Sequence, residues 1–182
     1  MDEILDRLPE LETPRLRLYP QAIEDLDARL AMDRDPEVMR FIREIPEDAE
    51  AQRESLRSLI LGAGRKQRFW HIEEKENPGF LGWCGLFPLD NSQEIEIGYR
   101  LSRASWGHGI ASEAAGVVLD YGFRVLEIDP ILAVVHPQNI ASQYVLAKIG
   151  LKRDGEGFHY GHQLPIYRMT RADYIAGRSK KA

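Results

Sequence analysis

Apolar and polar positions along the chain follow two periods, which predicts both strands and helices. In the segment 15–19 apolar side chains recur at every second residue, so Leu16 and Leu18 share one face of an expected strand. In 109–124 they recur every three or four residues, which is the pattern of an amphipathic helix. The segment 131–135 is continuously apolar, which is typical of a buried strand.

Taken along the whole chain, these patterns predict one mixed α/β domain. The expected strands are 15–19, 69–74, 80–87, 94–101, 131–135, 151–158 and 164–170, and the expected helices are 24–31, a turn from Pro36, 47–61 beginning at Pro46, 109–124 and 140–149. Short turns between the three middle strands favour antiparallel pairing, and the later helices serve as crossovers. We expect a single domain over 14–176, a leader at 1–13 and a tail at 177–182.

Composition narrows the classes of function. A chain of 182 residues suits one domain, and its net charge of −5 without a basic block argues against direct binding of nucleic acid. The same charge favours cationic substrates such as amines. Cys84 is the single cysteine and the histidines lack metal-ligand spacing, so we expect neither a disulfide nor a metal. An acidic start and the lack of a long apolar run indicate a cytoplasmic protein without a membrane segment.

One junction has the layout of a phosphate site: the strand 94–101, a loop with Gly107 and Gly109, and then a helix. A helix N-terminus offers unpaired amides and a positive dipole end, and glycines let the backbone close on an anion. The P-loop motif with its lysine is absent. The dinucleotide motif lacks its third glycine, and Glu127, at the spacing of its ribose acid, precedes the next strand instead of ending it.

Several short motifs occur in a characteristic order. They are ETPRLRL at 12–18, DPEVM at 35–39, EIGY at 96–99, WGHGIASEA at 106–114, NIAS at 139–142 and KIGL at 148–151. Together they resemble the GNAT acetyltransferase superfamily, most closely the branch of ribosomal-protein alanine and serine N-acetyltransferases. The resemblance implies a mixed, mostly antiparallel sheet of seven strands, splayed at the acetyl-CoA site, with four or so helices.

By the same resemblance, acetyl-CoA is the cosubstrate, and no metal takes part. The loop amides expected to hold its pyrophosphate are those of Trp106, Gly107, His108, Gly109, Ile110, Ala111 and Ser112. The pantetheine arm is expected to pair like a strand with 97–101, at Tyr99 and Leu101, and to contact Asn139 and Ser142. A backbone N–H near Tyr99 would polarise the thioester carbonyl. His108 stands where the family usually has Gln, Arg or Lys, so it gives the phosphates less positive charge.

The resemblance also suggests the catalytic residues. Glu96 lies where the family often has a glutamate near the amine, and it is either the general base or a recognition residue for the substrate cation. Ser142, three residues after Asn139, either donates a proton to the leaving sulfur or only bonds the backbone in the first turn of its helix. Many relatives have a tyrosine where this chain has Leu146, and Tyr144 would face elsewhere.

The acceptor side is less defined by the sequence. Glu94 shares a strand face with Glu96 and is expected to attract the substrate. Trp70, Trp83, Phe87 and Tyr160 either line an acceptor pocket or belong to the core, and the turn 159–162 is expected near the acceptor. Three functions stay open: acetylation of a protein N-terminus, acetylation of a small molecule (a polyamine, an aminoglycoside or an amino acid), and a weakly catalytic acyl-CoA-binding module. A homodimer is left open.

Overall fold

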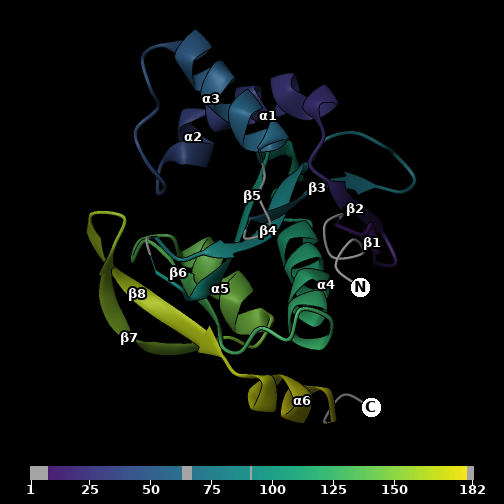
Figure 1. The fold of residues 1–182 in the computed structure, drawn as a ribbon, viewed down its shortest axis with the longest axis vertical. Coiled ribbons are helices and arrows are strands. Elements are labelled where there is room, and N and C mark those ends of the chain that lie inside the picture. The colour runs from purple at the N-terminus through teal and green to yellow at the C-terminus, as the bar shows by residue number, and fades with distance from the viewer. Residues whose placement is uncertain (1–7, 63–66, 91, 180–182) are drawn as a thin grey trace.

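A computed structural model describes residues 8–62, 67–90 and 92–179, and one mixed sheet lies at its centre (Figure 1). Its strands are β1 Leu11–Glu12, β2 Leu16–Pro20, β3 Arg68–Glu74, β4 Gly82–Pro88, β5 Ile95–Leu101, β6 Ile131–Val134, β7 Lys152–His159 and β8 His162–Met169. Across the sheet they follow the order β1-β2-β3-β4-β5-β6-β8-β7, and only β5 and β6 pair in parallel. The expected mixed, mostly antiparallel α/β fold is confirmed, with eight strands instead of seven.

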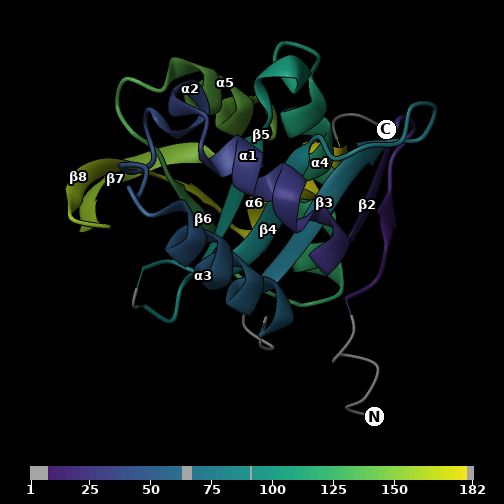
Figure 2. The ribbon, with the colours of Figure 1, turned by 90° about the horizontal axis from the view of Figure 1, so that it is seen from above.

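Helices pack on both faces of this sheet (Figure 2). They are α1 Leu26–Asp33, α2 Pro36–Met39, α3 Ala49–Leu61, α4 Ile110–Arg124, α5 Ile140–Lys148 and α6 Arg171–Ser179, six within the described residues against the four or so expected. Met32 of α1 and Val38 of α2 pack on Phe69 and Trp83 on one face. On the other face α4 packs against β2, β4 and β5. The sheet thus separates two apolar layers.

Helix α4 is held in place by its apolar stripe. Ile110, Ala114 and Val118 are buried in the main core, at the spacing that the sequence predicted. Because this stripe packs on β4 and β5, the N-terminus of α4 follows directly on the end of β5 through the loop that carries Gly107 and Gly109. The helix dipole therefore points at the same end of the sheet as the carboxyl end of β5.

The parallel pair β5 and β6 separates after two residues. Register is kept only at Ile95 with Ile131 and at Glu96 with Leu132. Strand β5 runs on to Leu101, while β6 ends at Val134. Beyond Glu96, the edge of β5 that faces β6 is therefore not paired with β6. The expected splay is present, and it leaves unpaired backbone groups that an extended ligand can bond.

Three local features differ from the sequence-based expectations. Strand β1 lies inside the expected leader, and α6, which was not expected, follows the last expected strand. Helix α3 begins after Asp48, whose carboxylate accepts from two amides, and not at Pro46. Residues 1–7 of the leader and 180–182 of the tail lie outside the described residues. None of the described helices combines the length and apolar character needed to cross a bilayer.

Candidate active site

The loop before α4 forms an open anion cradle. Gly107 and Gly109 have φ of 78° and 76°, in the left-handed region that glycine adopts most easily. No side chain caps the 15-residue helix α4, whose N-cap is Gly109. A Cβ built on Gly107 would meet no atom within 4 Å. The amides of this turn are therefore accessible to a bulky anion, and the arrangement fits a pyrophosphate.

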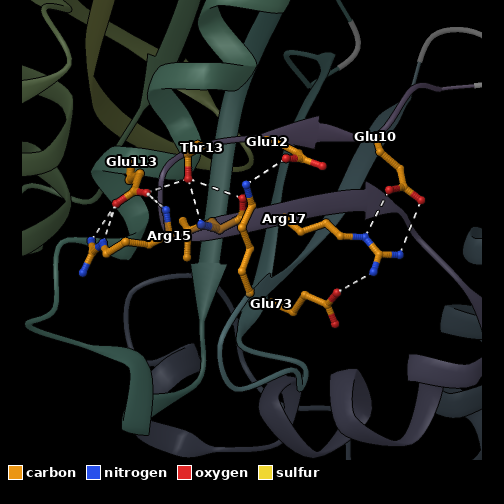
Figure 3. A network of polar contacts seen from close by, with 9 residues as sticks. Glu10, Glu12, Thr13, Arg15, Arg17, Glu73 and Glu113 are labelled. Carbon is orange, nitrogen blue, oxygen red and sulfur yellow. Dashed lines mark hydrogen bonds and ion pairs between the residues drawn. The ribbon is translucent and has the colours of Figure 1, made fainter.

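Arg15, from a different part of the chain, bonds this loop, and Figure 3 shows its contact with Glu113 of α4. Its Nη2 donates to the carbonyl oxygen of His108 at 3.0 Å and also lies 2.7 Å from the Glu113 carboxylate. Thr13 donates to the same carboxylate at 2.5 Å. Partial burial raises the pKa of Glu113, but hydrogen bonds from Thr13 and Arg15 outweigh it and hold that pKa below its ordinary value. Glu113 therefore anchors Arg15 beside the cradle and does not face the phosphates itself.

A pocket of about 470 Å³ adjoins the cradle. Its lining includes His108, Gly109 and Ser112 of the loop and the cations Arg15 and Lys148. The sequence analysis did not select Arg15 or Lys148, because neither lies in the loop motif. Lys148 and Arg15, which is paired with Glu113, are the two basic side chains of this lining besides His108.

The remaining loop positions serve the fold. Ile110 is buried in the core and Ala111 packs against it. Leu101 is also a core residue, and its carbonyl accepts from the indole of Trp106 at 3.0 Å. This bond fixes the turn between β5 and the cradle, so Leu101 and Trp106 contribute through backbone placement.

A larger cleft of about 1400 Å³ opens where β5 and β6 separate. Its lining brings together Glu96, Tyr99, Asn139 and Ser142, all of which the sequence analysis had selected. Asn139 caps α5 through a hydrogen bond that its Oδ1 accepts from the amide of Ser142 at 3.1 Å. The cleft thus has a base candidate and a hydroxyl pair, and it lies along the strand that leads to the cradle.

Glu96 is the buried carboxylate of the cleft, with 4% of its surface exposed. Burial raises its pKa to about 7, although a hydrogen bond from the Tyr160 hydroxyl lowers it. Tyr160 comes from the tip of the β7–β8 hairpin, and its hydroxyl accepts from the amide of Asp90 at 2.9 Å. A carboxyl with a pKa near neutrality suits proton transfer at physiological pH. Tyr160 thus holds the base candidate and does not belong to the core.

Tyr160→Phe is expected to shift the acid limb of the kcat–pH profile to higher pH. The hydroxyl lowers the pKa of Glu96, so its removal lets burial raise that pKa further above 7. A base with a raised pKa is ionised only at higher pH. The profile of kcat against pH measures the shift, with Tyr144→Phe, exposed on α5, as the control. An unshifted acid limb would mean that Tyr160 does not influence the base.

Tyr99 and Ser142 form a hydroxyl pair on the other side of the cleft. The Tyr99 hydroxyl lies 3.0 Å from Oγ of Ser142 and donates to the Ser142 carbonyl oxygen at 3.0 Å. Burial raises the pKa of Tyr99 despite the hydrogen bond with Ser142, so the phenol stays protonated. From the sequence, only the backbone near Tyr99 was expected to take part. Leu146 is buried and Tyr144 is exposed, so neither presents a hydroxyl here.

Ser142→Ala is expected to lower kcat with little change in the KM of acetyl-CoA. A hydrogen bond that strengthens as negative charge develops on sulfur contributes on the order of 2–4 kcal/mol, by analogy with an oxyanion donor. Because the two hydroxyls are bonded, the effects of Ser142→Ala and Tyr99→Phe should not add. Steady-state kinetics of the single and double variants measure this. A change in kcat below about threefold in all of them would leave Ser142 as a helix-capping residue only.

The aromatic residues divide between core and cleft. Trp70 is fully buried and its indole donates to the carbonyl oxygen of Pro9, so it belongs to the core. Trp83 and Phe87 line the cleft. Phe87 also fills the space above Gly98, since a Cβ there would lie 2.7 Å from its ring. The absence of a side chain at Gly98 therefore makes room for the Phe87 ring.

Comparison with known proteins agrees with this geometry. A family profile described as an acetyltransferase (GNAT) domain matches residues 15–152. The uncharacterized N-acetyltransferase p20 of Bacillus licheniformis is 34% identical over 80% of this chain and 83% of its own length. The spermidine N(1)-acetyltransferase of Escherichia coli K12 is 26% identical over 79% of this chain and 76% of its own.

Solved structures share the fold at lower identity. A GNAT-family acetyltransferase from Bacillus anthracis superposes with a TM-score of 0.75 at 24% identity, covering 90% of this chain and 99% of the other. The spermidine N-acetyltransferase of Vibrio cholerae, solved with CoA and spermine, gives 0.72 at 18% identity, with coverage of 90% and 99%. The ribosomal-protein-S5-alanine acetyltransferase of Vibrio fischeri gives 0.70 at 17% identity, with coverage of 92% and 99%.

Proposed function

Because the chain belongs to the GNAT acetyltransferase family and transfers the acetyl group of acetyl-CoA to an amine, we propose that Glu96 is its base and that the pair Tyr99–Ser142 supplies the proton to sulfur. One observation carries this proposal. A buried carboxylate with a pKa of about 7 and a protonated hydroxyl pair line the same cleft, on the strand that leads to the phosphate cradle. A module that only binds acyl-CoA has no use for that combination.

The cradle of Trp106 to Ser112 holds the pyrophosphate, with Arg15 and Lys148 beside it. The unpaired edge of β5 at 97–101 binds the pantetheine arm, and Asn139 at the start of α5 contacts it. Acetyl-CoA supplies the acetyl group as a thioester. The protein fixes that group between Glu96 and the hydroxyl pair, which places the amine and the thioester in line.

Proton transfers then follow from the positions of these side chains. Alkyl amines are mostly protonated at neutral pH, so one proton must leave before nitrogen can attack the thioester carbon. Glu96 accepts the amine proton, directly or through a water. As the C–N bond forms and the C–S bond breaks, Ser142 or Tyr99 donates a proton to sulfur. The second proton that nitrogen loses restores this hydroxyl through water, so that the products are the amide and free CoA.

The acceptor is a small primary amine. Glu96 is buried, and Phe41 stacks on His136 in the lining of the cleft, with ring centroids 5.2 Å apart. The Tyr160 hydroxyl covers Glu96 from the β7–β8 hairpin. A bulky polypeptide N-terminus would have to displace one of these contacts. The sequence motifs favour the branch of ribosomal-protein N-acetyltransferases, and a ribosomal-protein-alanine acetyltransferase shares the fold of this chain.

A panel of amines with acetyl-CoA, followed by release of free thiol, tests the proposal. Small primary amines should release CoA in step with their own acetylation, and peptides with free N-termini should be slower. Binding of acetyl-CoA without amine-dependent thiol release would identify a binding module. Faster turnover of peptides than of small amines would favour a protein acceptor.

A further inference from the structure

Resting on the function proposed above, we propose that the acceptor amine carries a carboxylate, which binds Arg29 and Arg100 in the acceptor end of the cleft. The substrates are therefore amino acids and related zwitterions, and not polyamines. The proposal comes from a buried excess of positive charge in the lining of the cleft, together with donors that lack partners.

Two buried arginines face a single aspartate in this region. Arg29 of α1 is 3% exposed and Asp33, one turn later, is 4% exposed. Arg100 of β5 donates to Asp33 at 2.6 Å, with 12% of its side chain exposed. The Arg29 guanidinium donates to the neutral amide of Gln21 at 2.7 Å. Burying a charge without an opposite charge is costly, so two guanidinium groups with one carboxylate leave a place for an anion.

Unsatisfied donors gather at the same place. Within the described residues, Nε of Arg29, Nε of Arg100 and Nε1 of Trp83 are buried without a hydrogen-bond partner. All three residues line the cleft. The guanidinium carbons of Arg29 and Arg100 lie 5.3 and 5.4 Å from the centroid of the Trp83 ring. Buried polar groups normally have partners, so three free N–H groups around one indole indicate a ligand that accepts hydrogen bonds.

Arginines outnumber carboxylates in the lining of the cleft. Burial lowers the pKa of Arg29 to about 10, which keeps it charged at neutral pH. Arg40 and Arg43, on the segment that follows α2, also line the cleft, where Glu44 is their acidic neighbour. Besides Asp33, Glu44 and the base Glu96, no carboxylate lines the cleft within the described residues. A polyamine needs several carboxylates to bind its cationic nitrogens, whereas the arginines that line this cleft outnumber its carboxylates.

The spacing suits an amine with an anion at its other end. Residues two and four positions apart on a strand share a face, so Glu96 and Arg100 point toward the same side of β5. Their Cα atoms are roughly 13 Å apart for a strand rise of about 3.3 Å per residue, and both side chains extend into the cleft. An ω-amino acid long enough to bridge the two groups can therefore bind Arg100 and Arg29 through its carboxylate and present its amine toward Glu96.

The test compares amino acids with their own amides. Wild-type protein and acetyl-CoA are assayed with glycine, β-alanine and longer ω-amino acids, each paired with its amide, and with spermidine and a short neutral peptide. In the longer ω-amino acids the amine lies far from the carboxylate or amide group, so its pKa is similar in the acid and in the amide. For the best-fitting chain length, kcat/KM should favour the acid by about 100-fold, the scale of a buried Arg–carboxylate pair. Equal or better turnover of the amides or of spermidine overturns the proposal without touching the acetyltransferase function.

Substitutions then assign the preference to the arginines. Arg100→Gln and Arg29→Gln should each reduce the acid-to-amide ratio by about tenfold or more, whereas Arg57→Gln, on α3 and outside the cleft lining, should leave it unchanged. The ratio compares kcat/KM for the acid and for its amide on the same protein sample, so partial loss of folding does not change it. If a variant does not fold, the comparison of acids with amides on the wild-type protein still tests the proposal. An unchanged ratio in both cleft variants overturns the assignment. If the wild-type protein acetylates none of the compounds in the panel, the proposed function is overturned as well.

Discussion

Glu96→Gln is expected to lower kcat at pH 7 by about 100-fold or more, the range typical of a lost general base. The amide keeps the shape of the side chain but cannot accept a proton. In the wild type the acid limb of kcat should report the pKa of Glu96, which burial raises from 4.5 to about 7. The variant should recover as pH rises, because the amine then loses its proton to solvent. Kinetics across pH 6 to about 10 measure both curves.

Stability separates this loss from unfolding. A carboxyl whose pKa is raised in the folded state contributes most to the stability of the fold below its unfolded pKa. For Glu96 this contribution is lost as pH rises through about 7. Ionised Glu96 therefore costs the fold up to about 3 kcal/mol above that pH, and Glu96→Gln should be no less stable at pH 8. Glu94→Gln is the control, because Glu94 is exposed and outside the cleft lining. If Glu96→Gln kept the wild-type profile, Glu96 would be a recognition residue.

Gly107→Glu is expected to weaken acetyl-CoA binding by about 100-fold or more, equivalent to roughly 2.7 kcal/mol. The new carboxylate would project into the cradle and repel the phosphates, and a φ of 78° disfavours any side chain there. Since a Cβ at this position meets no atom within 4 Å, the change should leave the unliganded fold intact. Calorimetric titration with acetyl-CoA measures the loss.

Gly155→Glu is a matched control for backbone strain. Gly155 also has a positive φ, 88°, and open space around its Cβ, but it lies on β7. The Gly155→Glu variant should bind acetyl-CoA with the affinity of the wild type. Shortened pantetheine analogues without the pyrophosphate should bind Gly107→Glu and the wild type alike. A folded Gly107→Glu protein with unchanged affinity for acetyl-CoA would remove the phosphates from this loop.

Local patterns in the sequence were sufficient for the cradle and most of the fold. Strand and helix periods predicted the elements around α4, and Gly107 and Gly109 marked a turn whose positive φ values the structure has. Strand β1 was missed because two residues carry no period, and its pairing with Leu18 and Arg17 is a long-range feature. Helix α6 is short, and its capping contacts between Thr170 and Asp173 are a signal that the sequence did offer.

Contacts between distant segments could not be read from the sequence. Tyr160 meets Glu96 across 64 positions, and Tyr99 meets Ser142 across 43. Arg29 falls within the expected helix 24–31, and only tertiary packing shows that it is buried beside Trp83. The net charge of −5 favoured cationic substrates, whereas the cleft itself is rich in arginine. Net charge describes the whole surface and not the site.

The most direct test of the account is a stoichiometric measurement of acetyl transfer. Wild-type protein, acetyl-CoA and an ω-amino acid are incubated together, and mass spectrometry of the acceptor is compared with the amount of free CoA, with Gly107→Glu as the protein control. The account predicts one acetyl group on the nitrogen of the acceptor for each CoA released by the wild type. At acetyl-CoA concentrations below the KM of the wild type, it predicts far less of both products for the variant. CoA released without an acetylated amine, or equal activity of the variant, would contradict it.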